Sequence, residues 1–203
     1  MIRINELKLP LDEDEKELYR LAAKALKIGE RHIRELTICK KSVDCRKKDD
    51  IKFIFSVDVA LDIDEKRVAS KAGNRVSLSE KSVYTLPPVK RKSTLRPVIV
   101  GFGPAGMFAA LTLTEAGLSP IIIERGETVD ERTASVKSFW RTRVLNPESN
   151  VQFGEGGAGT VSDGKLNTLV KDTYGRGKEV LSRFVEAGAP SEILYQQKPH
   201  LGT

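Results

Sequence analysis

The sequence predicts an α/β chain in two parts, a small α+β domain followed by the beginning of a parallel sheet with its crossover helix. Large apolar side chains stand at every second position of residues 51–61, which is the pattern of a half-buried strand. They are Ile51, Phe53, Phe55, Val57, Val59 and Leu61. Residues 98–123 hold two short apolar runs separated by a glycine-rich turn and an apolar helical segment. Between these regions, residues 87–96 are rich in proline and basic side chains, which is typical of a linker.

The first part, residues 1–86, has the pattern of an α+β domain. Its longest predicted helix has apolar residues on one side and acidic residues crowded at its start. Negative charge at a helix start is stabilised by the positive end of the helix dipole. The elements in order are a strand at 2–7, a helix at 11–28, strands at 34–40 and 51–61, a helix at 64–71 and a strand at 75–78. This β-α-β-β-α-β order predicts a ferredoxin-like plait.

The second part, residues 97–203, opens with a strand, a glycine-rich turn and a helix. Gly101 allows a tight turn after the strand, Gly103 allows close approach of a pyrophosphate, and Gly106 allows the helix to pack on the strand. Pro104 and Ala105 stand at the helix start, where free amides attract an anion.

The second apolar run of this part ends on an acid. Ile121, Ile122 and Ile123 are followed by Glu124, which lies 23 residues beyond Gly101. A carboxylate at this place can accept hydrogen bonds from ribose hydroxyls. The combination predicts a Rossmann-like unit that binds the adenosine diphosphate half of a dinucleotide.

A second glycine-rich stretch follows at residues 150–166, with five glycines between Gly154 and Gly164. Such a stretch is too rich in special backbone positions for a regular element and is predicted as a loop. Its amides can approach a flat or anionic ligand, and Ser162, Asp163 and Lys165 add polar contacts. A plain surface loop is the alternative.

The composition indicates a soluble globular protein, with 203 residues of which 39% are hydrophobic and 31% charged. No apolar run approaches the roughly 20 residues that span a bilayer. The amino terminus lacks the apolar segment of a signal peptide, so a cytoplasmic location is predicted. Cys39 and Cys45 are spaced for neither a zinc ribbon nor a CxxC site, and no metal site is predicted.

The charge is uneven along the chain. The net charge is +6, and residues 1–100 hold 23 Lys and Arg against 16 Asp and Glu. This asymmetry raises nucleic acid as a partner. However, part of the excess lies at Lys90, Arg91, Lys92 and Arg96, within the predicted linker, and the stretch around Phe53 lacks the RNA-recognition signature. The sequence therefore disfavours nucleic-acid binding.

At this point a family resemblance is visible. The stretch from Gly101 to Gly106, with Glu124-Arg125-Gly126, resembles the amino-terminal signature of FAD flavoproteins of the glutathione-reductase type. Residues 150–166 and 198–203, with Lys41–Arg46, resemble one bacterial group. This group comprises the uncharacterised FAD-dependent proteins, or NAD(FAD)-utilising dehydrogenases.

The resemblance implies a set of cofactor-binding residues. Those at the adenosine diphosphate would be Gly101, Gly103, Pro104, Ala105, Gly106, Glu124 and Arg125. Those near the flavin would be Gly156, Gly157, Ala158, Gly159, Ser162 and Lys165. No catalytic residue is implied. Members of the group continue well beyond residue 203, so the resemblance predicts an amino-terminal fragment with an incomplete FAD domain, inactive alone and weak in binding FAD.

The predicted function is that of an FAD-dependent oxidoreductase, a dehydrogenase, with NAD(P)H as an electron donor. Its partners would be FAD and an unknown small-molecule substrate or electron acceptor. Two alternatives stay open: a non-catalytic nucleotide- or RNA-binding module, and a Rossmann protein that binds only NAD. Flavin absorbance of the purified protein, retention on heparin and the dinucleotide released on denaturation separate the three.

Overall fold

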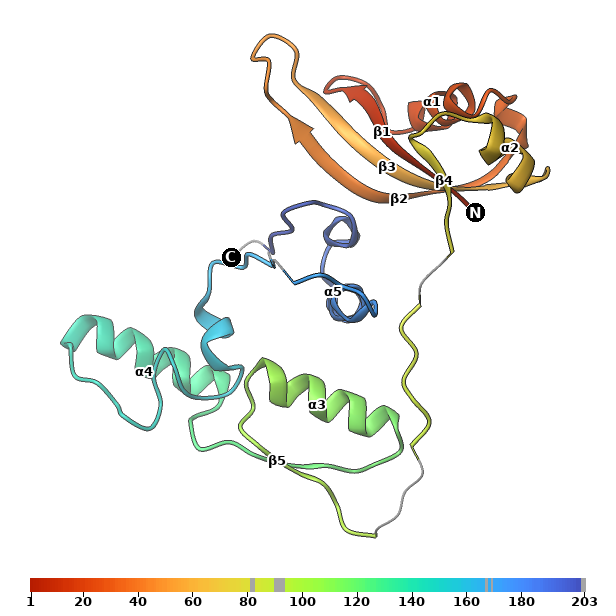
Figure 1. Ribbon diagram of the computed structural model, residues 1–203. Coiled ribbons are helices and arrows are strands. Elements are labelled where there is room, and N and C mark those ends of the chain that lie inside the picture. Colours follow the sequence, from red (N-terminus) through yellow and green to blue (C-terminus); the bar gives the residue numbers. More distant parts are fainter. Residues whose placement is uncertain (81–82, 90–93, 167, 169, 202–203) are drawn as a thin grey trace. The chain divides into compact units, whose positions relative to one another are not determined.

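A computed structural model describes residues 1–80, 83–89, 94–166, 168 and 170–201. The chain divides into two compact units (Figure 1). Unit 1 comprises residues 1–84 and 165–201, and unit 2 comprises residues 85–164. The basic run Lys90-Arg91-Lys92 of the predicted linker lies outside the described residues. In the described part of the chain, no helix is long and apolar enough to cross a membrane.

Unit 1 is built on a four-stranded antiparallel sheet in the order β2-β3-β1-β4. All six elements that the sequence predicts for residues 1–86 are present, in the predicted order. They are β1 (Ile2–Pro10), α1 (Glu17–Leu26), β2 (Ile33–Asp44), β3 (Lys52–Leu61), α2 (Glu65–Lys71) and β4 (Val76–Leu78). The mixed α/β class is therefore confirmed for this unit.

The core of unit 1 lies between the sheet and the helix α1. Strand β3 buries Phe55, Val57 and Val59 completely, as its alternating pattern predicts. Helix α1 buries Leu18 and Ala22 against them, because residues four apart lie on one helix face. Burial of one such large side chain stabilises the fold by about 1.5–3 kcal/mol.

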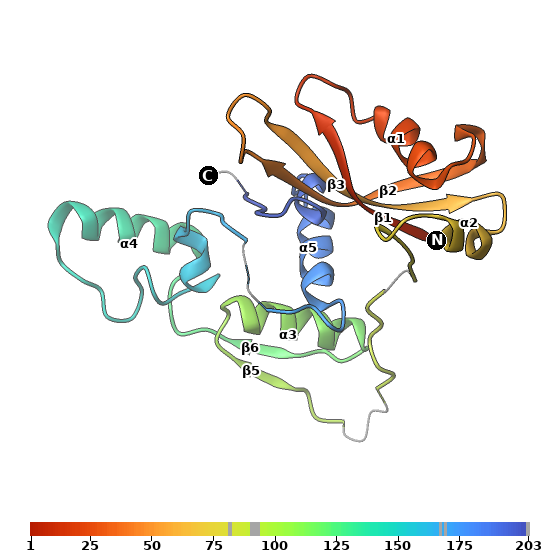
Figure 2. The same ribbon diagram turned by 45° about the horizontal axis from the view of Figure 1, so that its top comes forward.

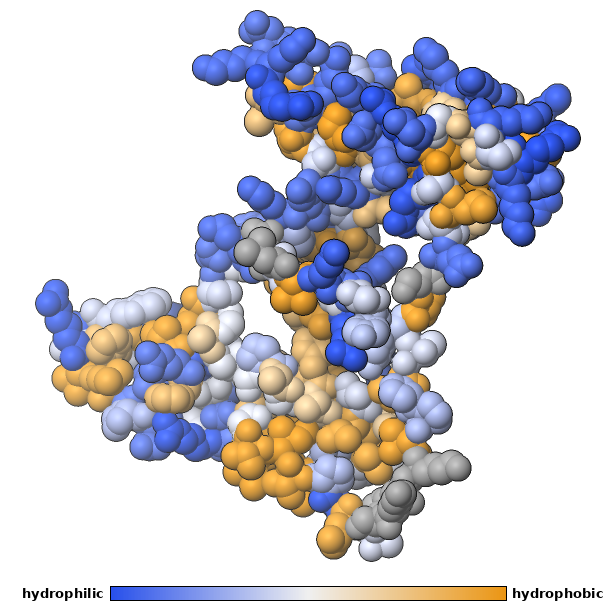
Figure 3. All heavy atoms as spheres, in the orientation of Figure 1, coloured by the Kyte–Doolittle hydropathy of each residue, from blue (hydrophilic) through white to orange (hydrophobic). Residues whose placement is uncertain are grey.

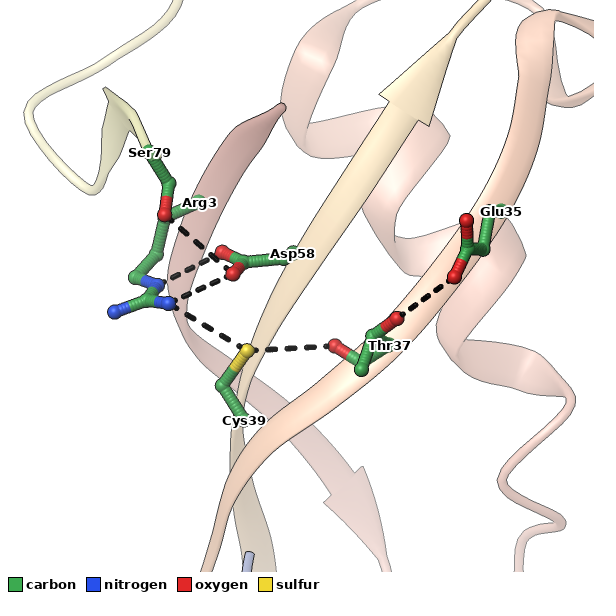
Figure 4. Close-up of polar contacts among 6 residues, drawn as sticks. All are labelled: Arg3, Glu35, Thr37, Cys39, Asp58 and Ser79. Atoms are coloured by element: carbon green, nitrogen blue, oxygen red, sulfur yellow. Dashed lines mark hydrogen bonds and ion pairs between the residues drawn. The ribbon is translucent and has the colours of Figure 1, made fainter. Parts of the chain in front are cut away.

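The opposite face of the sheet carries a polar cluster (Figure 4). Nε and Nη2 of Arg3 donate to the two carboxylate oxygens of Asp58 at 2.8 and 2.7 Å. The hydroxyl of Ser79 donates to the same carboxylate at 3.4 Å, and Nη2 of Arg3 lies 3.6 Å from the thiol of Cys39. Burial acts to raise the pKa of Asp58, but the hydrogen bonds from Arg3, Cys39 and Ser79 outweigh it and hold the pKa below its ordinary value.

Residues 165–201 belong to unit 1, which the sequence did not anticipate. The amide of Lys41 donates to the carbonyl of Tyr195 at 2.7 Å, and the amide of Gln197 donates to the carbonyl of Lys41 at 3.0 Å. Helix α5 (Arg176–Glu186) lies on the face of the sheet opposite α1 (Figure 2). The sequence grouped these residues with the nucleotide-binding half, and the predicted domain limits stay a prediction.

Unit 2 contains a two-stranded parallel sheet, β5 (Val98–Val100) and β6 (Ile121–Ile123), joined by α3 (Pro104–Glu115). Helix α4 (Val129–Thr142) and the 3-10 helix η2 (Gly157–Val161) follow. The sequence predicted the helix α3 after the glycine-rich turn and predicted a loop in place of η2. The strands leave apolar side chains exposed, Val100 at 84% and Ile123 at 53%, and Figure 3 shows apolar surface gathered over this part of the chain.

The partly buried ion pair between Arg3 and Asp58 makes the stability of unit 1 dependent on pH. Because the folded-state pKa of Asp58 is lowered, its contribution is present above about pH 4 and is lost as the pH falls through the folded-state value. We expect Asp58→Asn to lower the free energy of unfolding by about 1–3 kcal/mol at pH 7, and the deficit to shrink towards pH 2.5. Urea-dependent hydrogen exchange of the β3 amides measures it. The exposed Asp12, changed to Asn, is the control and should stay within about 0.5 kcal/mol of the wild type; an equal deficit at both pH values would contradict the account.

Candidate functional site

The glycine-rich turn of unit 2 joins the end of β5 to the start of α3. Gly101 has φ = 96°, which L side chains rarely adopt, and its amide donates to the carbonyl of Ile123 at 2.7 Å. Gly103 is the N-cap residue of α3 and Pro104 its first residue, a position where proline loses no helical hydrogen bond. The amides at the start of α3, including that of Ala105, thus stand at the carboxyl end of the parallel strands.

Gly106 marks the closest approach of helix and turn. A Cβ atom at this position would lie 2.1 Å from the carbonyl oxygen of Gly101 and 3.4 Å from the side chain of Ile99. The first distance is far too short for any carbon–oxygen contact. Gly106 is therefore required for the helix to pack on the strand end, which is the role that the sequence predicts.

Glu124 follows β6 directly and closes the site on one side. Its carboxylate accepts hydrogen bonds from the amides of Phe102 at 2.7 Å and Gly126 at 2.9 Å. The hydrogen bonds from Gly126 and Phe102 hold the pKa of Glu124 below its ordinary value, so the group is ionised at neutral pH. Each carboxylate oxygen has two lone pairs, and acceptor capacity remains for a ligand hydroxyl.

The second glycine-rich stretch packs against the first. The amide of Gly156 donates to the carbonyl of Phe102 at 2.9 Å. A Cβ atom on Gly157 would lie 3.1 Å from the Cα of Gly103, and one on Gly159 would lie 3.9 Å from Pro104. The structure thus brings together the two stretches that the sequence assigns to one cofactor. Ala158 lies between Gly157 and Gly159 in η2.

A further glycine pair holds the backbone of this region together. A Cβ atom on Gly126 would lie 2.4 Å from the Cα of Gly154, so the turn after Glu124 and the second glycine-rich stretch are in direct backbone contact. A side chain of any size at Gly126 would separate the two segments.

Three other predicted site residues have different surroundings. Arg125 lies over the ring of Phe153, with 4.2 Å between its guanidinium carbon and the ring centroid, a cation–π geometry. Ser162 ends η2, and its hydroxyl accepts a hydrogen bond from the amide of Gly164 at 3.3 Å. Lys165 belongs to unit 1, where its backbone forms an isolated antiparallel β-bridge with that of His200. Its role at a cofactor stays a prediction.

The sequence reasoning missed two residues that build the site. Arg132 of α4 is 1% exposed and donates to carbonyls of the second glycine-rich stretch. The carboxylate of Glu155 accepts a hydrogen bond from the amide of Val129 at 2.8 Å, and its own amide donates to the carbonyl of Glu127 at 3.1 Å. The available signal was periodicity, because Arg132 and the buried Val136 are four residues apart on one face of α4.

Unit 1 contains a cavity of about 1200 Å³ between the polar face of the sheet and α5. Burial, followed by the neighbouring Asp58, raises the pKa of the Cys39 thiol, so this group stays protonated at neutral pH. Cys39 and Cys45 are both free thiols. Within the described ranges, no group of three or more His, Cys, Asp or Glu residues is arranged to hold a metal ion.

Comparisons with known proteins find one family match in each unit. Residues 96–142 match the family described as "FAD binding domain", and residues 1–60 match the family described as "Domain of unknown function (DUF8436)". The first match covers β5, the glycine-rich turn, α3, β6, Glu124 and α4. The chain therefore carries a segment of the FAD-binding type.

Two relatives extend this result. An uncharacterized protein of Clostridium beijerinckii is 48% identical over 204 residues, which cover 100% of this chain and 38% of that protein. A dual trans-enoyl reductase/FAD-dependent monooxygenase of Aspergillus terreus is 40% identical over 65 residues, which cover 30% of this chain and 9% of that protein. The chain thus spans little more than a third of the length of the first relative and far less of the second.

Gly103 and Gly106 offer a matched pair of substitutions, since each change to alanine adds one carbon atom. Gly103→Ala places its Cβ in ordinary contact, 3.8 Å from the Cα of Gly157, and we expect unit 2 to keep its fold. Gly106→Ala places its Cβ against the backbone of Gly101. We expect the free energy of unfolding to fall by about 1–3 kcal/mol, as for an overpacked core. Thermal unfolding followed by the fluorescence of Trp140, which lies in α4, measures both. Equal stability of the two variants would refute the packing role of Gly106.

Proposed function

We propose that unit 2 holds the adenosine diphosphate half of FAD and that the chain is part of an FAD-dependent oxidoreductase. The observation that carries the proposal is the convergence of three predicted features on one backbone contact. The turn at Gly101–Gly106, the stretch around Gly156 and the carboxylate of Glu124 meet at the amide and carbonyl of Phe102. The match of residues 96–142 to an FAD-binding family supports the choice of dinucleotide.

The residues present suit this ligand. Gly103 and Gly157 lie so close that a side chain at Gly157 would meet the turn, and their bare backbones leave a surface on which a pyrophosphate can lie. The start of α3 offers free amides and the positive end of a dipole. Glu124 would accept hydrogen bonds from the ribose hydroxyls, and Arg125 and Phe153 would border the site.

Bound FAD would supply the redox chemistry through its isoalloxazine ring. The residues of this chain would bind and orient the cofactor, and the proposal assigns no acid, base or nucleophile among them. An electron donor such as NAD(P)H and a small-molecule substrate or acceptor complete the proposed reaction. The monooxygenase activity in the name of the Aspergillus terreus relative is not transferred, because the similarity covers 9% of that protein.

The finer fold and family assignments are part of this proposal. The order β2-β3-β1-β4, with every neighbouring pair antiparallel, supports a ferredoxin-like plait for residues 1–86. The parallel pair β5–β6 with its crossover helix supports a Rossmann-like unit. We assign the chain to the group of NAD(FAD)-utilising dehydrogenases on the motifs between Asn150 and Leu166. We further propose that it is an amino-terminal portion of such an enzyme.

Ligand competition tests the proposal directly. We expect FAD to quench in fluorescence on addition of the protein, ADP to displace it, and FMN, which lacks the adenosine, to leave it bound. Preference for NAD over FAD would favour the NAD-only alternative. Retention on heparin with salt-dependent RNA affinity and no FAD binding would favour the nucleic-acid alternative.

Glu124 gives the proposal a residue-level test. Glu124→Gln replaces one carboxylate oxygen by a donor, so that one of the amides of Phe102 and Gly126 loses its acceptor and the ribose contact weakens. We expect FAD affinity to fall by about 1.5–3 kcal/mol, the range for hydrogen bonds to charged groups. Fluorescence titration measures it, with Asp130→Asn in the first turn of α4 as the control. Unchanged affinity in a folded Glu124→Gln variant would remove Glu124 from the site.

A further inference from the structure

Arg132 makes four hydrogen bonds from within the interior of unit 2. Its Nε donates to the carbonyl of Asn150 at 2.8 Å, and its Nη2 donates to that of Val151 at 2.9 Å. Its Nη1 donates to the carbonyls of Glu155 at 2.8 Å and Gly157 at 2.7 Å. The acceptors lie on both sides of Gly154, so a single side chain ties the two arms of the second glycine-rich stretch.

The geometry requires arginine in particular. Loop carbonyls that are buried need donors, because an unpaired buried polar group is unfavourable by several kcal/mol. A guanidinium group presents five N–H donors in one plane, and a lysine ammonium presents three at one point. A guanidinium group can therefore donate to four carbonyls spread around one side chain, whereas an ammonium group cannot.

Gly154 gives independent evidence for the same arrangement. A Cβ atom at this position would lie 2.5 Å from the Cδ of Arg132, and the residue has φ = 123°. The glycine therefore leaves room for the arginine side chain to pass beneath the loop. Gly154 thus makes room for Arg132, whereas Gly157 makes room for the close approach of Gly103.

The charge of Arg132 is also unusual. Its four partners are carbonyl oxygens, and among the described residues no carboxylate lies within ion-pair distance of it. A buried cation without a contacting anion favours an anion nearby. Arg132 also lowers the pKa of Glu124, as a smaller cause than the hydrogen bonds from Gly126, Phe102 and Arg125.

We propose that Arg132 is a positioning residue of the dinucleotide site, which holds residues 150–157 against the Gly101–Gly106 turn and adds positive charge for the diphosphate. The inference rests on the proposed function for the identity of the ligand. The positioning part stands without the ligand, because the hydrogen bond between Gly156 and Phe102 depends on the loop conformation that Arg132 supports.

Two substitutions separate the hydrogen-bonding role from the charge. Arg132→Lys keeps the charge but cannot serve four carbonyls, and Arg132→Met removes both. Arg141→Met, at the exposed end of the same helix, is the control. In hydrogen-exchange measurements on the full 203-residue chain without ligand, we expect both Arg132 variants to exchange the amides of residues 155–157 at least tenfold faster. Protection in α3 should stay as in the wild type and in Arg141→Met.

The outcomes of the exchange experiment decide the positioning role. Wild-type protection at residues 155–157 in Arg132→Met would overturn it. Loss of protection that extends through α3 would also overturn it, because Arg132 would then support unit 2 as a whole. Guanidinium ion at millimolar concentration, added to Arg132→Gly, should restore part of the protection if the missing hydrogen bonds are the cause.

The ligand experiment decides the role of the charge. We expect the dissociation constants of FAD and ADP to rise at least tenfold in Arg132→Met and by a smaller factor in Arg132→Lys. Equal losses in the two variants would overturn the part assigned to the charge. If the wild type binds neither FAD nor ADP, the proposed function fails, while the exchange experiment still decides whether Arg132 positions the loop.

Discussion

The candidate site depends on direct contact between backbones that carry no side chains. Gly103 meets Gly157, and Gly126 meets Gly154, so the turn after β5 and the turn after β6 are both joined to one distant stretch. The hydrogen bond from the amide of Gly156 to the carbonyl of Phe102 fixes their register. A Cβ atom on Gly126 or Gly157 would push the facing backbones apart. The carboxylate of Glu124 would then lose the neighbours that orient it. The other features of unit 2 act on this contact.

Local patterns predicted much of this arrangement. Each predicted feature follows from one short stretch of sequence that is compatible with few local structures. These features are the turn residues Gly101 and Gly106, the acid at the end of β6 and the alternation in β3. Arg132 could not be found in this way, since an arginine inside a helix usually faces solvent and its partners are carbonyls with no sequence signature. The association of residues 165–201 with unit 1 depends on hydrogen bonds of Lys41 across more than 150 residues of sequence, which no local pattern encodes.

The two units satisfy the hydrogen-bond donors of an arginine differently. In unit 1, Arg3 binds both oxygens of Asp58, and the two charges compensate each other. In unit 2, Arg132 binds carbonyl oxygens, which satisfy its donors but carry no net charge. The first arrangement is electrically complete. In the second, no carboxylate among the described residues contacts the charge, and such a charge favours an anionic group nearby.

The balance of forces in unit 2 links its order to its ligand. Among its described residues, Val136 is the only buried hydrophobic side chain, and the other buried residues are Arg132, Ser149, Asn150 and Gly154. Polar contacts and glycine packing, with little apolar burial, therefore hold the site in place. A ligand that binds the folded form stabilises it by about 2.7 kcal/mol at a hundred times its dissociation constant, a large share of the stability of a marginal unit. Because the same backbone groups build the loop and would face the diphosphate, binding of the proposed dinucleotide would be coupled to ordering of the site. In the role proposed for it, Arg132 orders the loop before the ligand binds.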